Sequence, residues 1–284
     1  MKNDAIIEKA FAKINLTLSV GDKRPDGYHN ISSVMQTVTL CDTLTLTKAP
    51  DISLECNKKQ LPKGDANIAY RAAELFFEKT GISGGVNINL TKYIPVAAGL
   101  GGGSADAAAV LRGLNQLYSA GLDTKQLCEI GKEIGADVPF CIVGGTALAE
   151  GIGEKLTHIQ NKAQMNIVVA IGGEGVSTKY MYDMLDESGS KLDIDNNAMI
   201  EALQKGDSNA ASALLANDFE SVCMAVRPAV AQLKQDLLDE GALGALMSGS
   251  GSSVFGWFAD RKTAAQAATS LRKAGYFAAV CVKC

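Results

Sequence analysis

A glycine-rich segment, PVAAGLGGGSADAAAVL at residues 95–111, constrains this chain more than any other feature. Four glycines occupy the five positions from 99 to 103, directly before a run of alanines. Apolar residues alternate from Val86 to Leu90 before the segment, which predicts a strand, and they recur at helical spacing from Ala107 to Tyr118 after it. The segment is therefore expected to connect a strand to a helix and not to be a flexible linker.

This glycine loop has two possible roles, phosphate binding and simple packing. The first turn of a helix carries unpaired backbone N–H groups and a partial positive charge, and glycine lets an anion approach the backbone closely. The loop lacks the lysine of a Walker A motif before Ser104, and a dinucleotide fingerprint starting at Gly99 would need glycine at position 104. We expect the helix to begin at Ser104, whose hydroxyl could cap it or bind a metal ion. From the loop alone, a turn that only lets strand and helix pack remains the alternative.

Composition limits the class of protein. A chain of 284 residues with 47% hydrophobic content can bury a large core, and we expect two lobes. A net charge of -4 without a dense basic cluster argues against nucleic-acid and membrane partners. Asp4 and Glu8 interrupt any N-terminal signal sequence, and seven scattered cysteines fit a reducing compartment, so a cytoplasmic location is expected. The terminal CVKC lacks the further ligands that a closed zinc site needs.

The rest of the chain mixes strand and helix patterns, which predicts an α+β or α/β fold. Residues 10–20 alternate, with an apolar row from Ala12 to Val20 that predicts one buried face and a polar row that contains Lys13 and Asn15. We place the boundary between the lobes near residues 161–164, giving lobes 1–160 and 161–284. Further elements are expected as strands at 34–49 and 165–171, helices at 67–80, 197–203, 209–215 and 228–240, and a final helix and strand.

Three segments in order resemble the motifs of the GHMP kinase superfamily, the group that includes galactokinase, homoserine kinase and mevalonate kinase. They are AFAKINLTL at 10–18, PVAAGLGGGSADAA at 95–108 and MSGSGSSVFG at 247–256. Within the superfamily, RPDGYHNISSVMQTV, GADVPF and AEGIGE are similar to the branch that acts on a cytidine diphosphate-linked methylerythritol. Ala97 and Ala105 stand where that branch often has glycine and serine.

The resemblance implies a two-lobed fold, with an N-terminal lobe like ribosomal protein S5 domain 2, a ferredoxin-like C-terminal lobe and an active site in the cleft between them. It implies ATP-dependent phosphorylation of the 2-hydroxyl of the methylerythritol unit in non-mevalonate isoprenoid biosynthesis, with Mg²⁺. The expected partner is this small molecule, and the expected state is a monomer or weak homodimer. Another kinase of the superfamily and a catalytically silent nucleotide-binding module are the alternatives.

The resemblance also implies roles for single residues. Asp137 matches the catalytic base, although an Asp before Pro139 could equally be a helix cap. Lys13 matches the cation beside that base, and its alternative is a solvated lysine on an outward face. Substrate contacts fall on Asn15, Tyr28, His29 and Tyr182, with Tyr180 close enough to compete with Tyr182. Nucleotide contacts fall on Asn67 (also a possible helix N-cap), Lys92, Pro95, Val96, Ala97, Ala98, Gly99, Leu100, Gly101, Gly102, Gly103, Ser104 and Ala105, with Ser104 a candidate metal ligand.

Overall fold

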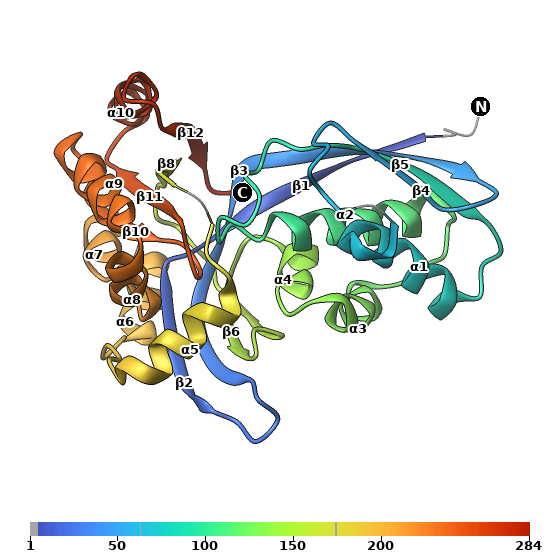
Figure 1. Cartoon of the computed structure of the whole chain (residues 1–284), viewed down its shortest axis with the longest axis horizontal. Coiled ribbons are helices and arrows are strands. Elements are labelled where there is room, and N and C mark those ends of the chain that lie inside the picture. Colours follow the sequence, from blue (N-terminus) through green and yellow to red (C-terminus); the bar gives the residue numbers. More distant parts are fainter. Residues whose placement is uncertain (1–4, 63, 174) are drawn as a thin grey trace. The chain divides into compact units, whose positions relative to one another are not determined.

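The computed structural model describes residues 5–62, 64–173 and 175–284 (Figure 1). The chain forms two compact units, each built from separate segments. The first contains residues up to 12, 41–95 and 101–144, and the second contains 13–40, 96–100 and 145–284. The long strands β1 (Ala5–Asn15) and β3 (His29–Ala49) pair with each other and contribute residues to both units. The lobe boundary near residue 160 stays a prediction.

The first unit is a small sheet with helices on one side (Figure 1). Strand β5 (Gly85–Thr91) pairs antiparallel with residues 43–49 of β3 and parallel with β4 (Ser53–Cys56). The predicted row from Val86 to Leu90 is buried, which confirms that strand. The helical elements are η1 (Gly64–Ala66), α1 (Ile68–Thr80), α2 (Gly102–Leu117), α3 (Thr124–Ile134) and α4 (Val138–Val143).

Local signals explain where the helices of this unit begin and end. The side chain of Asn67 accepts a hydrogen bond from the backbone N–H of Ala69 at 2.9 Å and caps α1, which ends at Gly81 with a left-handed φ of 66°. The helix predicted at 67–80 is thus confirmed. Helix α2 begins at Gly102 and not at the predicted Ser104. Gly101 occupies the N-cap position with a left-handed φ of 66°, which glycine adopts easily, and no side chain caps the helix.

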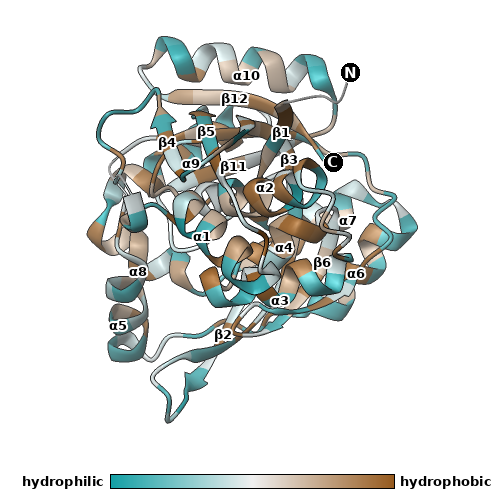
Figure 2. Cartoon of the chain, turned by 90° about the vertical axis from the view of Figure 1, so that its right-hand side faces the viewer, coloured by the Kyte–Doolittle hydropathy of each residue, from teal (hydrophilic) through white to brown (hydrophobic). Residues whose placement is uncertain are grey.

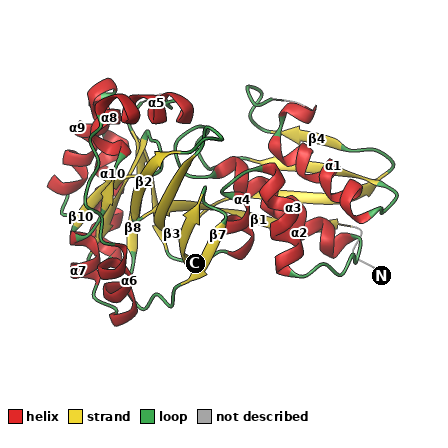
Figure 3. Cartoon of the chain, turned by 90° about the horizontal axis from the view of Figure 1, so that it is seen from below, coloured by secondary structure: helices red, strands yellow, loops and turns green. Residues whose placement is uncertain are grey.

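The second unit contains an antiparallel sheet in the order β10 (Gly244–Met247), β11 (Ser253–Phe258), β8 (Asn166–Ile171), β12 (Phe277–Val282). Helices α9 (Pro228–Asp239) and α10 (Arg261–Lys273) pack beside it (Figure 3). This arrangement agrees with the predicted ferredoxin-like lobe. The unit also contains β2 (Thr17–Lys23), β6 (Thr146–Gly151), β7 (Lys155–His158), β9 (Ala216–Asn217), α5 (Thr178–Ser188), α6 (Asn196–Lys205), α7 (Ser208–Ala213) and α8 (Phe219–Val226).

Helix faces follow the hydropathy of the sequence. Helix α10 buries Ala264, Ala268 and Leu271 and turns charged residues outward, whereas α2 is apolar over most of its surface (Figure 2). Among the helices in the described part of the chain, none combines the length and the apolar character needed to cross a membrane.

The prediction for residues 10–20 was wrong in one respect. The segment forms the end of β1 and the start of β2, and both of its faces are buried from Ala12 to Leu18. Lys13, Asn15 and Thr17 on the polar face are only 5%, 2% and 0% exposed. Partners distant in the sequence cover this face, as the site geometry shows.

Candidate active site

Residues of the three motifs at 10–18, 95–108 and 247–256 contact one another within the second unit. The backbone N–H of Lys13 donates to the carbonyl oxygen of Leu100 at 3.0 Å, and the hydroxyl of Ser248 donates to the carbonyl oxygen of Gly99 at 3.0 Å. The N–H of Ser253 donates to Ala98 O at 3.2 Å. A Cβ added at Gly99 would lie 2.1 Å from Ser248 O, so the close approach of the two loops requires glycine at position 99.

Lys13 lies inside this junction and not on a solvated face. Its ammonium donates to Asn15 Oδ1 at 2.7 Å, and Asn15 Nδ2 donates to Ser33 Oγ at 2.8 Å. A Cβ on Gly249 would lie 3.4 Å from Lys13 Nζ, so the third motif borders the ammonium. Because a buried ammonium is costly unless it serves a polar partner, the alternative of a solvated surface lysine is wrong.

Asn217 holds the third motif in place, although no sequence pattern pointed to it. Its Nδ2 donates to the carbonyl oxygens of Met247 and Gly249, each at 2.8 Å, and its Oδ1 accepts from the N–H of Phe219 at 3.0 Å. The residue is 1% exposed. All three contacts are to backbone atoms, so Asn217 fixes the path of the loop that contacts Gly99.

The first turn of α2 suits an anion. Ala105 N–H donates to Gly101 O at 2.8 Å, and the N–H groups of the three residues before it have no carbonyl one turn earlier within the helix. Together with the helix dipole, these N–H groups fit phosphate oxygens. Since no side chain caps α2, the suggested capping role of Ser104 is wrong. Before this turn, Ala97 adopts a left-handed φ of 54°.

Lys92, predicted to contact adenine, lies in a buried ion cluster of the first unit. Its ammonium contacts Asp42 Oδ2 and, at 2.7 Å, Asp106 Oδ2. Burial alone would lower the pKa of Lys92, but the two carboxylates outweigh burial and raise this pKa. Burial raises the pKa of Asp106 to about 8, opposed by Lys92 and reinforced by Asp42. The predicted adenine contacts of Lys92 and of Asn67, which caps α1, stay predictions.

Asp137 occupies the N-cap position of α4, but its side chain makes no capping hydrogen bond. The alternative role as a helix cap is therefore wrong. Pro139 in the first turn of α4 fixes the backbone there, and α4 packs against α2 and α3. The carboxylate is held on a rigid element, partly exposed. Its role as a base stays a prediction.

Of the residues predicted to bind cytidine, His29 and Tyr182 are in contact, whereas Tyr28 is exposed. His29 is 5% exposed and stacks on Tyr182, with ring centroids 4.7 Å apart and planes 17° apart. Its Nε2 lies 2.9 Å from Asp186 Oδ1, a contact that the sequence did not reveal. Tyr28 is 60% exposed and Tyr180 is 46% exposed. Tyr182, and not Tyr180, is thus the aromatic of α5 that lies at His29.

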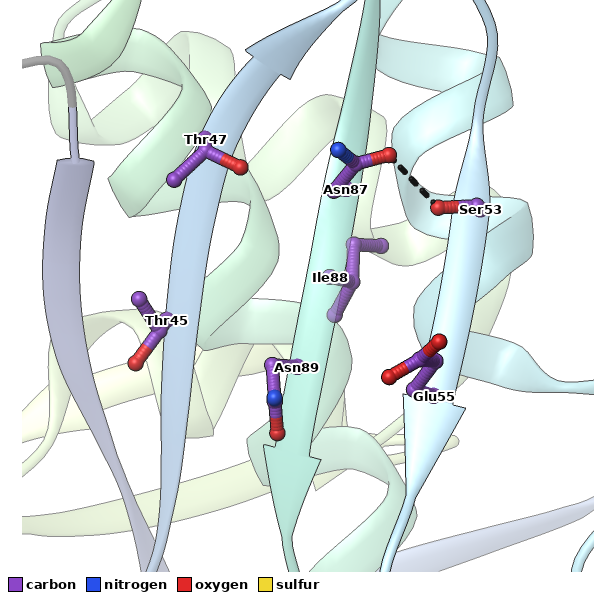
Figure 4. A pocket seen from close by; sticks show the side chains of 7 residues that line it. All are labelled: Thr45, Thr47, Ser53, Glu55, Asn87, Ile88 and Asn89. Carbon is purple, nitrogen blue, oxygen red and sulfur yellow. Dashed lines mark hydrogen bonds between the residues drawn. The ribbon is translucent and has the colours of Figure 1, made fainter.

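A shallow polar groove of about 400 Å³ lies on the open face of the sheet in the first unit (Figure 4). Ser53 Oγ donates to Asn87 Oδ1 at 2.7 Å within it. None of the predicted site residues lines this groove, which is formed by Thr45, Thr47, Ser53, Glu55, Asn87, Ile88 and Asn89.

Comparison with known proteins gives one consistent result. Residues 67–145 match the family described as GHMP kinases N terminal domain, and residues 199–276 match GHMP kinases C terminal. The chain is 46% identical over 269 residues to 4-diphosphocytidyl-2-C-methyl-D-erythritol kinase of Caldicellulosiruptor saccharolyticus, covering 94% of this chain and 93% of that protein. It is 45% identical over 270 residues to the kinase of the same name from Acetivibrio thermocellus, covering 95% of each. A crystal structure of 4-(cytidine 5'-diphospho)-2C-methyl-D-erythritol kinase matches with a TM-score of 0.83 and 35% identity, covering 98% of this chain and 99% of that one.

Proposed function

The chain belongs to the 4-diphosphocytidyl-2-C-methyl-D-erythritol kinases of the GHMP superfamily, and we propose that it phosphorylates the 2-hydroxyl of this substrate with Asp137 as general base and Lys13 as its electrostatic partner. The burial of Lys13 among the three converging motifs carries the proposal. Its ammonium lies beside Asn15 and the third motif, and a buried ammonium is costly unless it serves a polar partner.

The residues divide the work of phosphoryl transfer, which needs alignment, charge neutralisation and a proton acceptor. The first turn of α2 and the glycine loop hold the phosphates of ATP through backbone N–H groups. Asp137 accepts the proton of the attacking hydroxyl, and Lys13 stabilises the charge that develops. The contact between Ser248 and Gly99 O keeps the two glycine loops together.

Magnesium fits this donor set only with the help of the nucleotide. The described residues contain no group of three or more His, Cys, Asp or Glu side chains that could hold a metal ion. Ser104, in the first turn of α2, would supply a hydroxyl, and phosphate oxygens and water would complete the shell. When bound, Mg²⁺ neutralises phosphate charge.

The cytidine end of the substrate is assigned to His29 and Tyr182, with Tyr28 as the exposed ring that closes over the base. The stacked pair of His29 and Tyr182 supports this role, because it brings an aromatic ring and a polar ring together within the second unit. Asn15 is assigned to the methylerythritol unit. We also assign the enzyme to the cytoplasm, which fits the free thiols of Cys41, Cys56 and Cys223.

A radiolabelled phosphate-transfer assay with four acceptors tests the substrate. The cytidylyl substrate should be phosphorylated, and homoserine, galactose and mevalonate should not. Transfer to any of the last three would favour another kinase of the superfamily, and transfer to none would favour a silent nucleotide-binding module.

Replacement of the proposed base tests the mechanism. Asp137→Asn should keep ATP binding and lower turnover by about 10²- to 10⁴-fold, because general-base catalysis contributes that much. The matched control is Asp193→Asn, at an exposed acid of the second unit, which should leave turnover within about twofold. Unchanged turnover in Asp137→Asn would remove this residue as the base.

A further inference from the structure

Three charged side chains form a buried ion cluster in the first unit. The side chains of Lys92, Asp42 and Asp106 are 4%, 0% and 5% exposed. Lys92 Nζ contacts both carboxylates, and among the described residues Asp106 Oδ1 has no hydrogen-bond partner. Such a cluster is costly to bury, and apolar side chains of similar volume often stabilise a fold as well or better. Stability alone is therefore a weak reason for these three charges.

The cluster joins the chain on both sides of the glycine loop. Lys92 follows β5 and precedes the loop, whereas Asp106 lies in the first turns of α2 and follows the loop. Asp42 on β3 is the common anchor: its Oδ1 accepts from the backbone N–H groups of Tyr93 at 2.5 Å and Ile94 at 2.8 Å. The chain before the loop and the chain after it are thus tied to one strand.

The first residue of α2, Gly102, also lies close to the ammonium of Lys92. A Cβ added at Gly102 would lie 3.3 Å from Lys92 Nζ and 2.9 Å from Ile94 Cγ2. The backbone at Gly102 carries one of the unpaired N–H groups of the helix. Lys92 and Ile94 pack against Gly102 and are themselves held by Asp42. They therefore fix the direction in which the free N–H groups of α2 point.

We propose that Asp42, Lys92 and Asp106 are positioning residues for the phosphate loop, and that Lys92 acts through the loop and not on adenine. The proposal rests on the proposed function, because it takes ATP as the ligand of the loop. The cluster sets the affinity of the loop for the phosphate end of the nucleotide and leaves the binding of the base and of the cytidylyl substrate unaffected.

Competition experiments separate the two roles of Lys92. Inorganic tripolyphosphate and adenosine are each measured as competitors of ATP in the wild type and in Lys92→Met. We expect the inhibition constant of tripolyphosphate to rise about tenfold and that of adenosine to stay within about twofold, a difference of about 1.4 kcal/mol between the two ends of the ligand. The reverse result would assign Lys92 to adenine and overturn the proposal.

A more conservative variant and a control distinguish the proposed role from a loss of folding. Asp106→Asn keeps the volume and an oxygen acceptor for Lys92, and should raise the tripolyphosphate constant about threefold with the KM for the cytidylyl substrate unchanged. Lys79→Met removes an exposed lysine paired with Glu133 at 2.8 Å and should change neither constant. If the Tm of the cluster variants falls while both inhibition constants stay within twofold of wild type, the cluster serves only the stability of the fold. That result would overturn the proposal.

The same measurements distinguish the failure of this proposal from that of the proposed function. If tripolyphosphate does not compete with ATP in the wild type, the loop does not hold the phosphates, and both proposals fall. If it competes equally well in the wild type and in Lys92→Met, the loop keeps its assigned ligand and only the positioning role falls.

Discussion

Replacement of Asn217 by leucine should damage both stability and turnover, although this residue is absent from the motifs of the sequence. The side chain is 1% exposed and makes three hydrogen bonds, to Met247 O, Gly249 O and the N–H of Phe219. Leucine has a similar volume but cannot make any of them. The change therefore removes polar contacts without opening a large cavity.

The expected size of the effect follows from the groups left unpaired. A buried donor or acceptor without a partner costs about 1–3 kcal/mol, so three of them cost at least about 3 kcal/mol. This is a large share of a typical unfolding free energy of about 5–15 kcal/mol. The loop from Met247 to Gly249 then loses its fixed path, and with it the contact between Ser248 and Gly99 O. Turnover should fall at least about tenfold, which corresponds to about 1.4 kcal/mol of lost transition-state stabilisation.

Urea unfolding followed by circular dichroism measures the first effect, and release of ADP measures the second. Asn217→Asp is a more selective variant. It keeps the acceptor for the N–H of Phe219 but places a carboxylate oxygen against the carbonyl oxygens of Met247 and Gly249. Its turnover should be as low as that of Asn217→Leu. Asn197→Ala, at an exposed position of α6, is the control. An Asn217→Leu protein with stability within about 0.5 kcal/mol and turnover within twofold of wild type would refute the reasoning.

Three further predictions concern the loops and the ion cluster. Lys13→Met should lower turnover about 100-fold or more with a much smaller change in the KM for the cytidylyl substrate, as steady-state kinetics would show. Gly99→Ala should cost about 2 kcal/mol or more in unfolding free energy, because a Cβ would lie 2.1 Å from Ser248 O and the φ of 76° disfavours alanine. The pKa of Asp106 is raised by burial to about 8 from 3.8, so its protonated form is favoured in the folded state. The stability of the wild type relative to Asp106→Asn should therefore fall as pH rises from about 4 to about 8 in urea titrations, and a difference that is constant or grows would contradict this sign.

Elements whose signals are local could be predicted from the sequence. The alternation from Val86 to Leu90 and the glycine at the end of α1 depend on neighbours within a few residues, and both predictions were confirmed. The segment at 10–20 was misjudged on its polar face, because Ser33 and Ser248 cover that face from positions far along the chain. A single sequence does not contain this pairing.

The site divides in the same way. Resemblance to a kinase superfamily brought forward Lys13, His29 and Tyr182, and the structure gives each a buried or stacked setting. Asp186 and Asn217 were missed, because each acts on a partner about 30 or more positions away, at His29 and at the third motif. An acid or amide with such a partner looks like any surface residue until the fold is known.

Asp106 shows why the residue type alone does not define a role. An acid near the start of a helix normally stabilises the helix dipole. At a helix that is to hold phosphate, however, an ionised carboxylate would repel the ligand. The structure buries Asp106 and pairs it with Lys92 at 2.7 Å, and burial raises the pKa of Asp106 to about 8 against the opposing effect of Lys92. Burial favours the neutral form of Asp106, and Lys92 offsets the charge of the ionised form, so in either state this carboxyl group repels phosphate less than an exposed, unpaired carboxylate would.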